Sequence, residues 1–409
     1  MGGKAALFLV LGFSLIFMVA GRNFNSLATS TVDNFANYYF DTKAHHLAAS
    51  GVNLVTNQIF LNGAMADQTF NYSFDQGTVS VTLSTIDAFQ NIKQLLSVGT
   101  YSNVTSTIRI ILKPSVFSKY AYFSNTEGAN IWWTTTDTVW GPLHTNGQLR
   151  VADRPVFMGK VTLDGSIVKY SNSAQPQFLG GVQTGVHVTI PSNGVSNVGL
   201  AAAAGGANIT GHSLVYLEFR GDSIRYKYSS GGSWTYVLGS TFAPNGAIYA
   251  NDAQLRIKGR VTGQYTIAAS GTGGDRGKIF LDDDVYYNTD PRVNPNSQDM
   301  LGIVAQRDVI ITENSANNNN ITIQASIYSE SGSFQAEDYQ GRPPSGAIYL
   351  YGGVIQNARG PVGTFTTNHG VTTIVSGFSK RYRYDDRFMI ANPPFFPGTG
   401  SFEIVSWFE

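Results

Sequence analysis

The first sixty residues carry an uninterrupted helical pattern of apolar positions. An uncharged apolar segment covers residues 5–21 and lies between Lys4 and Arg22. Beyond it, apolar residues recur at helical spacing among Asn, Asp, Lys and Thr, and no proline occurs in the first 113 residues. The pattern predicts a single helix from about Lys4 to Asn62, which would be roughly 85–90 Å long at 1.5 Å per residue.

The apolar segment at the start of this helix has the length and composition of a membrane anchor. Residues 5–21 lie at the lower length limit for a helix that crosses the hydrocarbon core of a bilayer. A secretory signal peptide would have a shorter apolar region, followed by a small-residue cleavage site and an unrelated sequence. Because the helical pattern continues past residue 21, we expect a membrane-anchored, protruding helix.

From about Asp67 the pattern changes to short segments that are typical of β-strands. Thr69–Phe74 and Val79–Leu83 flank a turn sequence and predict an antiparallel hairpin. A further strand is expected over Thr107–Leu112, ending at Pro114. These elements predict a small unit tied to the base of the helix. Trp132, Trp133 and Trp140 follow it and are expected to fill a junction core.

The remaining sequence shows a repeat of short strands. The strand centres Ile257, Ile279, Ile303, Ile323 and Ile348 are separated by 22, 24, 20 and 25 residues. Such a period is typical of a solenoid, and the scarcity of helical pattern favours a parallel β-helix over leucine-rich repeats. A β-sandwich with evenly spaced strands is the alternative.

Two details of the repeat give testable expectations. The four-residue sequence of Gln148–Val151 (QLRV) recurs with one change at Gln254–Ile257 (QLRI), which indicates that the two segments occupy equivalent coils of the repeat. The alternation of Ile321, Ile323, Ala325 and Ile327 predicts that these side chains face the inside of a coil. We also expect Ile257, Ile279, Ile303 and Ile323 to stack as one inward ladder.

Together these patterns predict an α+β, mainly β, fold: a long N-terminal helix, a small antiparallel β unit and a right-handed parallel β-helix-like solenoid with an inserted β-rich subdomain. The predicted domains are residues 1–66 (N-terminal membrane helix), 67–138 (small α+β unit and junction) and 139–409 (head, with an insertion at 170–240). Within the insertion, Leu217–Arg220 and Ser223–Tyr228 predict a hairpin.

Composition narrows the functional classes. Lys plus Arg and Asp plus Glu are equal at 27 each, so no global field would attract nucleic acid, and none is expected as a partner. The chain contains no cysteine, which excludes disulfides, thiolate metal sites and a cysteine nucleophile. Only 13% of the residues are charged, which suggests that much of the surface lies against neighbouring subunits.

The candidates for chemistry are few. Asp282 and Asp284 are the best carboxylate pair and are candidates for a calcium site or for acid/base cleavage of a glycan. Arg256-Ile257-Lys258 and His369-Gly370 resemble fragments of pectin-hydrolase motifs, but they occur in the wrong order along the chain. We therefore expect no enzymatic activity, no catalytic residue and no cofactor.

Several segments of the sequence resemble a known protein family. The apolar helix, the amphipathic continuation Thr42–Asn53 and the β-rich remainder resemble a type IV pilin-like protein, of the large pilus-associated or pseudopilin-like kind with a β-helix head. Asp299–Ala305, Gly352–Gln356, Arg381–Asp385 and Pro393–Pro397 resemble parts of such heads.

The resemblance implies a structural subunit of an extracellular type IV pilus-like filament. The protein would be held in the cytoplasmic membrane before assembly and would then join a helical homopolymer on the cell surface. Its partners would be further copies of itself and the pilus assembly machinery, with a surface or glycan ligand of unknown identity. Adhesion and secretion are roles that such filaments serve.

Pilins usually carry a glutamate at the fifth mature position, and Ala5 occupies that place if Met1 is the mature start. The missing glutamate favours an alternative, a minor tip or assembly-priming subunit. A membrane-tethered β-helix glycan-active enzyme is the second alternative. For filament assembly the expected core residues all lie on the apolar helix: Leu7, Leu9, Leu11, Leu15, Ile16, Val19, Leu27, Val32 and Phe35.

Overall fold

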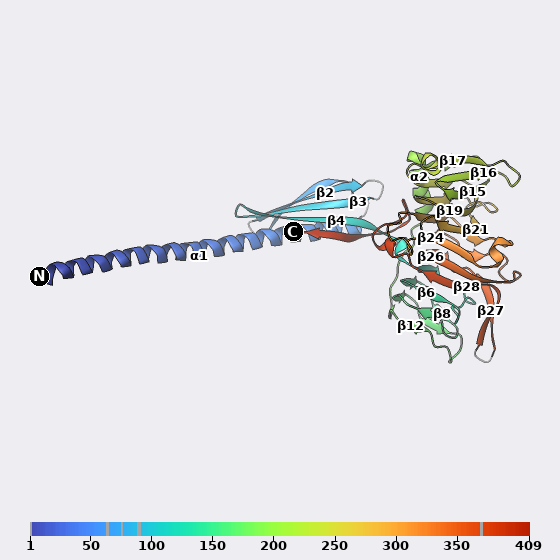
Figure 1. Cartoon of the computed structure of the whole chain (residues 1–409), viewed down its shortest axis with the longest axis horizontal. Helices are drawn as coiled ribbons and strands as arrows, with labels where there is room; N and C mark the ends of the chain where they lie inside the picture. Colours follow the sequence, from blue (N-terminus) through green and yellow to red (C-terminus); the bar gives the residue numbers. More distant parts are fainter. Residues whose placement is uncertain (1, 63–64, 75–76, 88–90, 369–370) are drawn as a thin grey trace. The chain divides into compact units, whose positions relative to one another are not determined.

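Helix α1 (Gly2–Leu61) opens the chain as a single uninterrupted helix, as the sequence predicts. The computed structural model describes residues 2–62, 65–74, 77–87, 91–368 and 371–409 (Figure 1). These residues form two compact units, Met1–Lys113 with Phe402–Glu409, and Pro114–Ser401. A long helix followed by a mostly β region makes the fold class α+β, in agreement with the sequence.

An antiparallel sheet covers the C-terminal half of α1. Its order is β1-β2-β3-β4-β29, with antiparallel pairing from β1 to β4. The strands are β1 (Gln68–Phe74), β2 (Gly77–Asp87), β3 (Ile92–Tyr101), β4 (Val104–Val116) and β29 (Gly398–Phe408). The predicted hairpin is therefore confirmed, whereas the predicted end of a strand at Pro114 is wrong, because β4 continues to Val116.

Close contact between helix and sheet explains why the sequence pattern missed β3. The inward positions of β3 include Lys93, Ser97 and Gly99 in addition to Leu95, so apolar residues do not alternate along this strand. Ser97 donates a hydrogen bond to the carbonyl oxygen of Ala48 (2.8 Å). A Cβ atom at Gly99 would lie 2.2 Å from the carbonyl oxygen of Ala44, so only glycine permits this approach.

The second unit is a parallel β-solenoid whose turns add strands to successive faces, named here A, B and C. Face A contains β14 (Ala207–Ile209), β18 (Ala247–Ala250), β20 (Gln264–Ala269), β22 (Met300–Ala305), the second halves of β24 (Ile321–Ser329) and β26 (Pro344–Ala358), β5 (Tyr122–Thr126), β7 (Leu143–Thr145), β10 (Val161–Leu163) and β13 (Val182–Thr184). The prediction of parallel coils is confirmed.

Faces B and C complete each turn. Face B contains the first halves of β15 (Leu214–Gly221), β19 (Gln254–Val261) and β21 (Ile279–Tyr287), then β23 (Val309–Ile311), β25 (Phe334–Ala336), β8 (Leu149–Val151) and β11 (Ile167–Lys169). Face C contains the second halves of β15, β19 and β21, the first halves of β24 and β26, then β28 (Val371–Arg383), β6 (Thr138–Trp140), β9 (Val156–Phe157) and β12 (Gln177–Phe178). The two repeated segments, Gln148–Val151 and Gln254–Ile257, both lie on face B, and each follows a strand of face A.

The order of strands along face A differs from their order in the sequence. The first coils, β5 to β13, stack onto the last one, because Val354 of β26 pairs in parallel with Tyr122 of β5. After β13 the chain crosses the outside of face A to reach β14 at the other end of the stack. Along this path Val188 donates to Asn146 (3.0 Å) and Tyr328 donates to the carbonyl oxygen of Pro191 (2.8 Å). The coils formed by the first and last parts of the solenoid sequence are therefore adjacent in the stack.

The crossing segment gives face A a second, outer core. Helix α2 (Gly194–Gly205) packs against β18 and β20. The outward side chains of face A are buried beneath this segment and beneath aromatic residues near both ends of the unit, in the cluster formed by Phe117, Phe123, Val195, Val198, Ala201, Ala202, Ala247, Ala268, Val304, Tyr328, Ile355 and Phe396. This second core explains why strands such as β22 are buried on both sides.

The structure distributes the predicted insertion, residues 170–240, over several elements. Strands β12 and β13 finish a regular coil, and α2 belongs to the crossing segment. Strand β15 pairs in parallel with β19 and also begins the predicted hairpin with β16 (Ser223–Lys227), which in turn pairs with β17 (Thr235–Leu238). The solenoid itself begins at β5, before the predicted start of the head at residue 139.

The remaining elements are short or lie outside the coils. They are η1 (Phe117–Lys119), α3 (Gly239–Phe242), η2 (Ala316–Asn318), β27 (Gly363–Asn368), which forms a hairpin with β28, and η3 (Asp386–Met389). Of the predicted junction tryptophans, Trp133 is fully buried in the solenoid core, whereas Trp140 is 38% exposed. The prediction is thus wrong for Trp140, whose strand β6 turns it outward.

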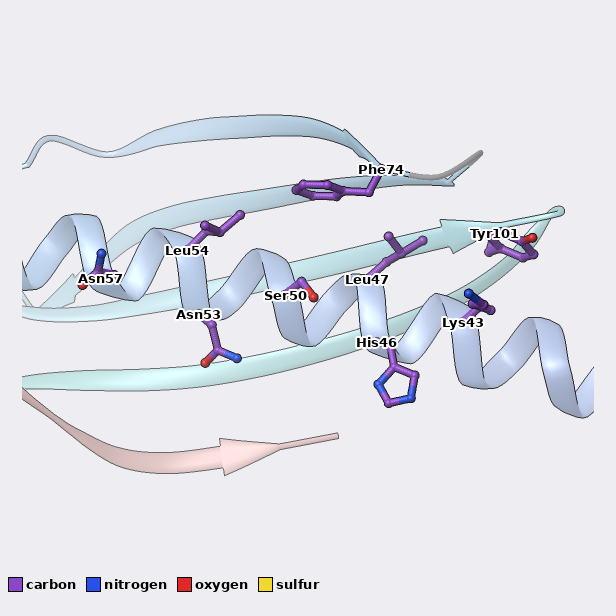
Figure 2. A pocket seen from close by; sticks show the side chains of 9 residues that line it. All are labelled: Lys43, His46, Leu47, Ser50, Asn53, Leu54, Asn57, Phe74 and Tyr101. Atoms are coloured by element: carbon purple, nitrogen blue, oxygen red, sulfur yellow. The ribbon is translucent and has the colours of Figure 1, made fainter.

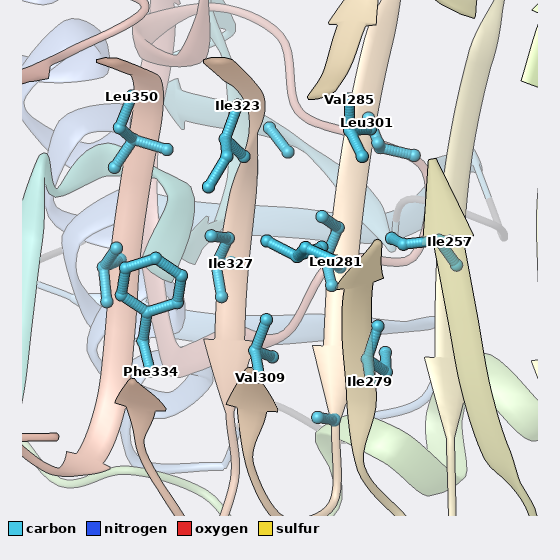
Figure 3. Packing of buried hydrophobic residues seen from close by; sticks show 14 of the residues in the cluster. Ile257, Ile279, Leu281, Val285, Leu301, Val309, Ile323, Ile327, Phe334 and Leu350 are labelled. Atoms are coloured by element: carbon cyan, nitrogen blue, oxygen red, sulfur yellow. The ribbon is translucent and has the colours of Figure 1, made fainter. Parts of the chain in front are cut away.

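Inward side chains stack in rows along the solenoid (Figure 3). The predicted inward side of Ile321, Ile323, Ala325 and Ile327 is confirmed, since all four are buried in the core. The prediction of one ladder through Ile257, Ile279, Ile303 and Ile323 is wrong. They lie on different faces: Ile303 pairs with Ile267 and Ile327 on face A, whereas Ile323 pairs with Leu350 on face C.

Loops of unequal length between the faces explain this error. Residues at similar sequence spacing reach different faces when the intervening turns differ in length. One true row runs along face A through Ile248, Ile267, Ile303, Ile327, Val354, Tyr122, Leu143, Val161 and Val182.

Two buried ion pairs cross the seam at which the first and last coils meet. Glu127 accepts a hydrogen bond from Arg359 (2.7 Å), and Asp137 accepts one from Lys380 (2.8 Å). The Arg359 and Lys380 cations lie 4.4 and 5.3 Å from the centre of the Trp133 ring. Buried pairs of this kind are costly to break, because one partner would be left as an uncompensated charge.

Burial and pairing act in opposite directions on these groups. Burial disfavours the charge of Arg359, but Glu127, Tyr122 and Asp137 together outweigh this effect and raise the pKa of the guanidinium. Burial lowers the pKa of Lys380, and Asp137 offsets only part of that effect. Asp137 also accepts hydrogen bonds from the backbone amides of Thr134 (2.9 Å) and Lys380 (3.0 Å). These bonds fix the register between the first and last coils.

We expect Ile303→Ala to lower the free energy of unfolding by about 2–5 kcal/mol, the range for a buried large-to-small change. Ile303 is fully buried between Ile267 and Ile327, so the substitution would leave an apolar cavity in the core. Urea unfolding of the full chain would measure the change. Val293→Ala, at an 84% exposed position, serves as the control and should be near neutral. Equal midpoints for the two variants would contradict the assignment.

We expect Lys380→Met to destabilise the head by about 3–5 kcal/mol, because Asp137 would remain buried without its counter-charge. The double variant Asp137→Asn/Lys380→Met should recover part of this loss. Lys160→Met removes an exposed lysine and is the matched control. If Lys380→Met moved the urea midpoint no further than Lys160→Met, the seam would not depend on this pair.

Candidate functional site

The N-terminal half of α1 is an apolar surface without a partner among the described residues of the chain. The apolar side chains from Leu7 to Val19 each expose more than half of their surface. The segment is long and apolar enough to cross a membrane by length and composition, with a mean hydropathy of 2.1 over its best window, none of which is buried. Because exposed apolar area is unfavourable in water, this half of the helix requires lipid or another apolar surface.

The C-terminal half of the same helix is held firmly. Ala48, Val52, Val55 and Ile59 are fully buried against the antiparallel sheet, at the three- and four-residue spacing of one helix face. A truncation at residue 67 would remove these side chains and uncover the sheet core. The helix and sheet of this unit therefore share one core and are expected to fold together.

The structure places all nine predicted assembly residues at exposed positions of α1. Their exposed fractions range from 52% for Leu11 to 72% for Phe35. The set is Leu7, Leu9, Leu11, Leu15, Ile16, Val19, Leu27, Val32 and Phe35. Their role in assembly stays a prediction.

Beyond the apolar segment, the exposed apolar residues narrow to a stripe. Phe24, Leu27, Phe35 and Tyr38 recur at spacings that place them on one side of a helix, and each is more than 60% exposed. Asp33 lies nine residues after Phe24, which puts it on the opposite side at 3.6 residues per turn. The sequence interpretation did not include Phe24 and Tyr38, although the same periodicity identifies them.

A groove lies beside the C-terminal half of α1, on a different side of the helix from the centre of this stripe. It has a volume of about 630 Å³ and is lined by Lys43, His46, Leu47, Ser50, Asn53, Leu54, Asn57, Phe74 and Tyr101 (Figure 2). The first seven residues lie on the helix, while Phe74 and Tyr101 come from the ends of β1 and β3. The groove therefore offers a second surface of this helix, beside the sheet, that another helix could pack against.

The predicted carboxylate site has a structural role. Asp282 accepts hydrogen bonds from Nε (3.0 Å) and Nη2 (2.5 Å) of Arg256 and from the hydroxyl of Thr312 (2.9 Å). Asp284 accepts from the backbone amide of Thr322 (2.7 Å), and burial raises its pKa. Arg256 is thus committed to Asp282.

No group of three or more metal-ligating side chains occurs among the described residues. The pair His369-Gly370 lies outside the described residues, so its comparison with pectin-hydrolase motifs stays a matter of sequence. Arg220-Gly221-Asp222 forms the turn between β15 and β16, with Arg220 opposite Ser223.

Comparisons with known proteins give a short result. A family described as a domain of unknown function (DUF4900) matches residues 90–165. No curated protein matches the chain. Among solved structures, the crystal structure of the competence-associated pilin ComZ from Thermus thermophilus is similar over 90% of this chain and 97% of that chain, with 11% identity and a TM-score of 0.37. The long apolar N-terminal helix of the present chain fits a pilin.

Proposed function

We propose that the protein is a structural subunit of an extracellular type IV pilus-like filament. The single observation that carries the proposal is the division of α1 into a half that is buried in its own sheet and a half whose apolar side chains are exposed. Before assembly, the uncharged segment sits in the cytoplasmic membrane. After assembly, it packs among the same segments of other copies, so both environments bury the same surface.

The exposed stripe and the groove support helix packing beyond the membrane segment. Phe24, Leu27, Phe35 and Tyr38 lie on the polar part of α1, where lipid tails would not reach if residues 5–21 span the bilayer. A neighbouring apolar helix would cover this stripe. The partners are therefore further copies of the chain, delivered by the pilus assembly machinery, and the solenoid provides the outer surface.

A minor tip or assembly-priming subunit uses the same helix and differs in its position in the filament. We favour a structural subunit, whether major or minor, over a glycan-active enzyme, because Arg256 and Thr312 occupy the carboxylate of Asp282 and leave it poorly suited to proton transfer.

We expect Leu15→Asp to abolish filaments while the protein remains folded. An aspartate at the centre of a membrane helix costs about 2.5–3.5 kcal/mol on insertion scales, and the same charge would be buried among apolar helices in a filament. Asn37→Asp introduces the same charge at an exposed polar position on the side of α1 that carries Asp33, away from the stripe, and is the matched control. Electron microscopy of sheared cell-surface material would count the filaments. Normal filaments from Leu15→Asp would refute the proposal.

We expect the purified protein to leave pectins, alginates and peptidoglycan uncut, with or without calcium. The reason is that the carboxylates of Asp282 and Asp284 already accept hydrogen bonds from Arg256, Thr312 and Thr322, which leaves them poorly suited to acid/base catalysis. Reducing-end assays would detect cleavage. Activity that disappears in an Asp282→Asn/Asp284→Asn double variant would promote the enzyme alternative.

A further inference from the structure

The outer side of face C carries arginine and aromatic side chains at the seam of the solenoid. Arg381 of β28 lies opposite Tyr349 of β26, and Arg383 lies between Tyr351 of β26 and Trp140 of β6. Neighbouring strands are about 4.8 Å apart, and alternate residues of one strand point to the same side. Two guanidinium groups and two exposed rings therefore occupy one small patch, with Trp140 38% and Tyr349 50% exposed.

The surface at this patch is hollowed. One hollow of about 270 Å³ is lined by Trp140, Arg292, Tyr349, Leu350, Arg381 and Arg383. A second one, of about 410 Å³, is lined by Trp140, Gly141, Met158, Gly159, Arg383, Tyr384 and Asp386. Because both hollows share Trp140 and Arg383, they form one elongated depression that crosses the strands β26, β28 and β6 and continues toward the turn after β9.

The depression is lined by three arginines, Arg292, Arg381 and Arg383, and by one carboxylate, Asp386. Arg292 is held by Asp290 and lies 5.1 Å from the centre of the Tyr351 ring. Arg381 donates to the carbonyl oxygen of Lys380 (3.2 Å), which is a neutral acceptor. Neither Arg381 nor Arg383 forms an ion pair with a carboxylate of the described residues. The guanidinium groups of Arg381 and Arg383 can therefore pair with an anionic ligand.

We propose that this depression binds an acidic polysaccharide, a linear glycan that carries carboxylates on its sugar rings. Guanidinium groups bind carboxylates with two parallel hydrogen bonds, so Arg381 and Arg383 would hold acidic groups along the chain. Trp140 and Tyr349 provide flat apolar faces for the sugar rings between these contacts. The elongated shape suits a polymer that runs along the solenoid axis across the strands.

Two features favour a glycan over single-stranded nucleic acid. Asp386 lines the far hollow, where it can accept hydrogen bonds from sugar hydroxyls but would repel a continuous row of phosphates. The chain is also neutral, with 27 basic and 27 acidic residues, and therefore lacks the broad positive field that attracts nucleic acid. The site does not depend on filament assembly, so it can fail or hold independently of the proposed function.

The test is binding of the full-length protein, in detergent, to polygalacturonate by biolayer interferometry at physiological ionic strength. The same polymer with its carboxyl groups methyl-esterified is the ligand control, and it should bind at least tenfold more weakly. Arg383→Gln, Arg381→Gln and Trp140→Ala should each weaken binding by about tenfold, which corresponds to about 1.4 kcal/mol. Arg260→Gln removes an exposed arginine of β19 and should leave binding unchanged.

Thermal melting would verify that each variant remains folded, and Arg383→Lys gives a second reading at the same position. Lysine keeps the charge but lacks the fork, so this variant should bind more weakly than the parent protein and more tightly than Arg383→Gln. Equal binding of the esterified polymer, or unchanged affinity of Arg383→Gln, would overturn the proposal. So would tighter binding of oligodeoxythymidylate, which would indicate a nucleic-acid surface instead.

Discussion

The unequal burial of helix α1 is the constraint on which the rest of the protein depends. Val52, Val55 and Ile59 are buried in the antiparallel sheet, and the Gly99 backbone lies against the helix at a distance that no larger residue permits. The same rigid helix continues into a segment whose apolar side chains have no counterpart among the described residues. A helix anchored so firmly at one end presents its other end in a defined orientation, which favours ordered packing with identical helices over non-specific association.

The solenoid is subject to a different constraint, because the order of the strands in its stack differs from their order in the sequence. Glu127 and Arg359 are 232 residues apart, and Asp137 and Lys380 are 243 residues apart. The first coils can find their final neighbours only when the last coils exist. Charged pairs at this seam contribute specificity, because a slip of the register by one residue would bury Glu127 or Asp137 without a cation. Rows of Ile and Val alone would tolerate such a slip more readily.

Local patterns predicted the local structure, and their failures have physical reasons. The spacing of three and four residues predicted α1, and the alternation of apolar residues predicted the inward side of β24. Both predictions succeeded because each pattern depends on the geometry of a single element. Strand β3 was missed because Lys93, Ser97 and Gly99 are inward positions that serve hydrogen bonds or close approach. The isoleucine ladder was wrong because loops of unequal length move equal spacings to different faces. The Trp140 and Arg383 cluster depends on pairing between β6 and β28, which no local pattern encodes.

The boundaries between the two units fall within β4, at Pro114, and within β29, after Ser401, and these two strands are neighbours in the antiparallel sheet. Each unit has hydrophobic clusters of its own. This connection allows the outer face of the solenoid to change without altering the packing of α1 on its sheet. A surface such as the depression at Arg381 and Arg383 can therefore be adapted to a ligand, while the apolar helix remains under the separate constraint of covering its exposed half.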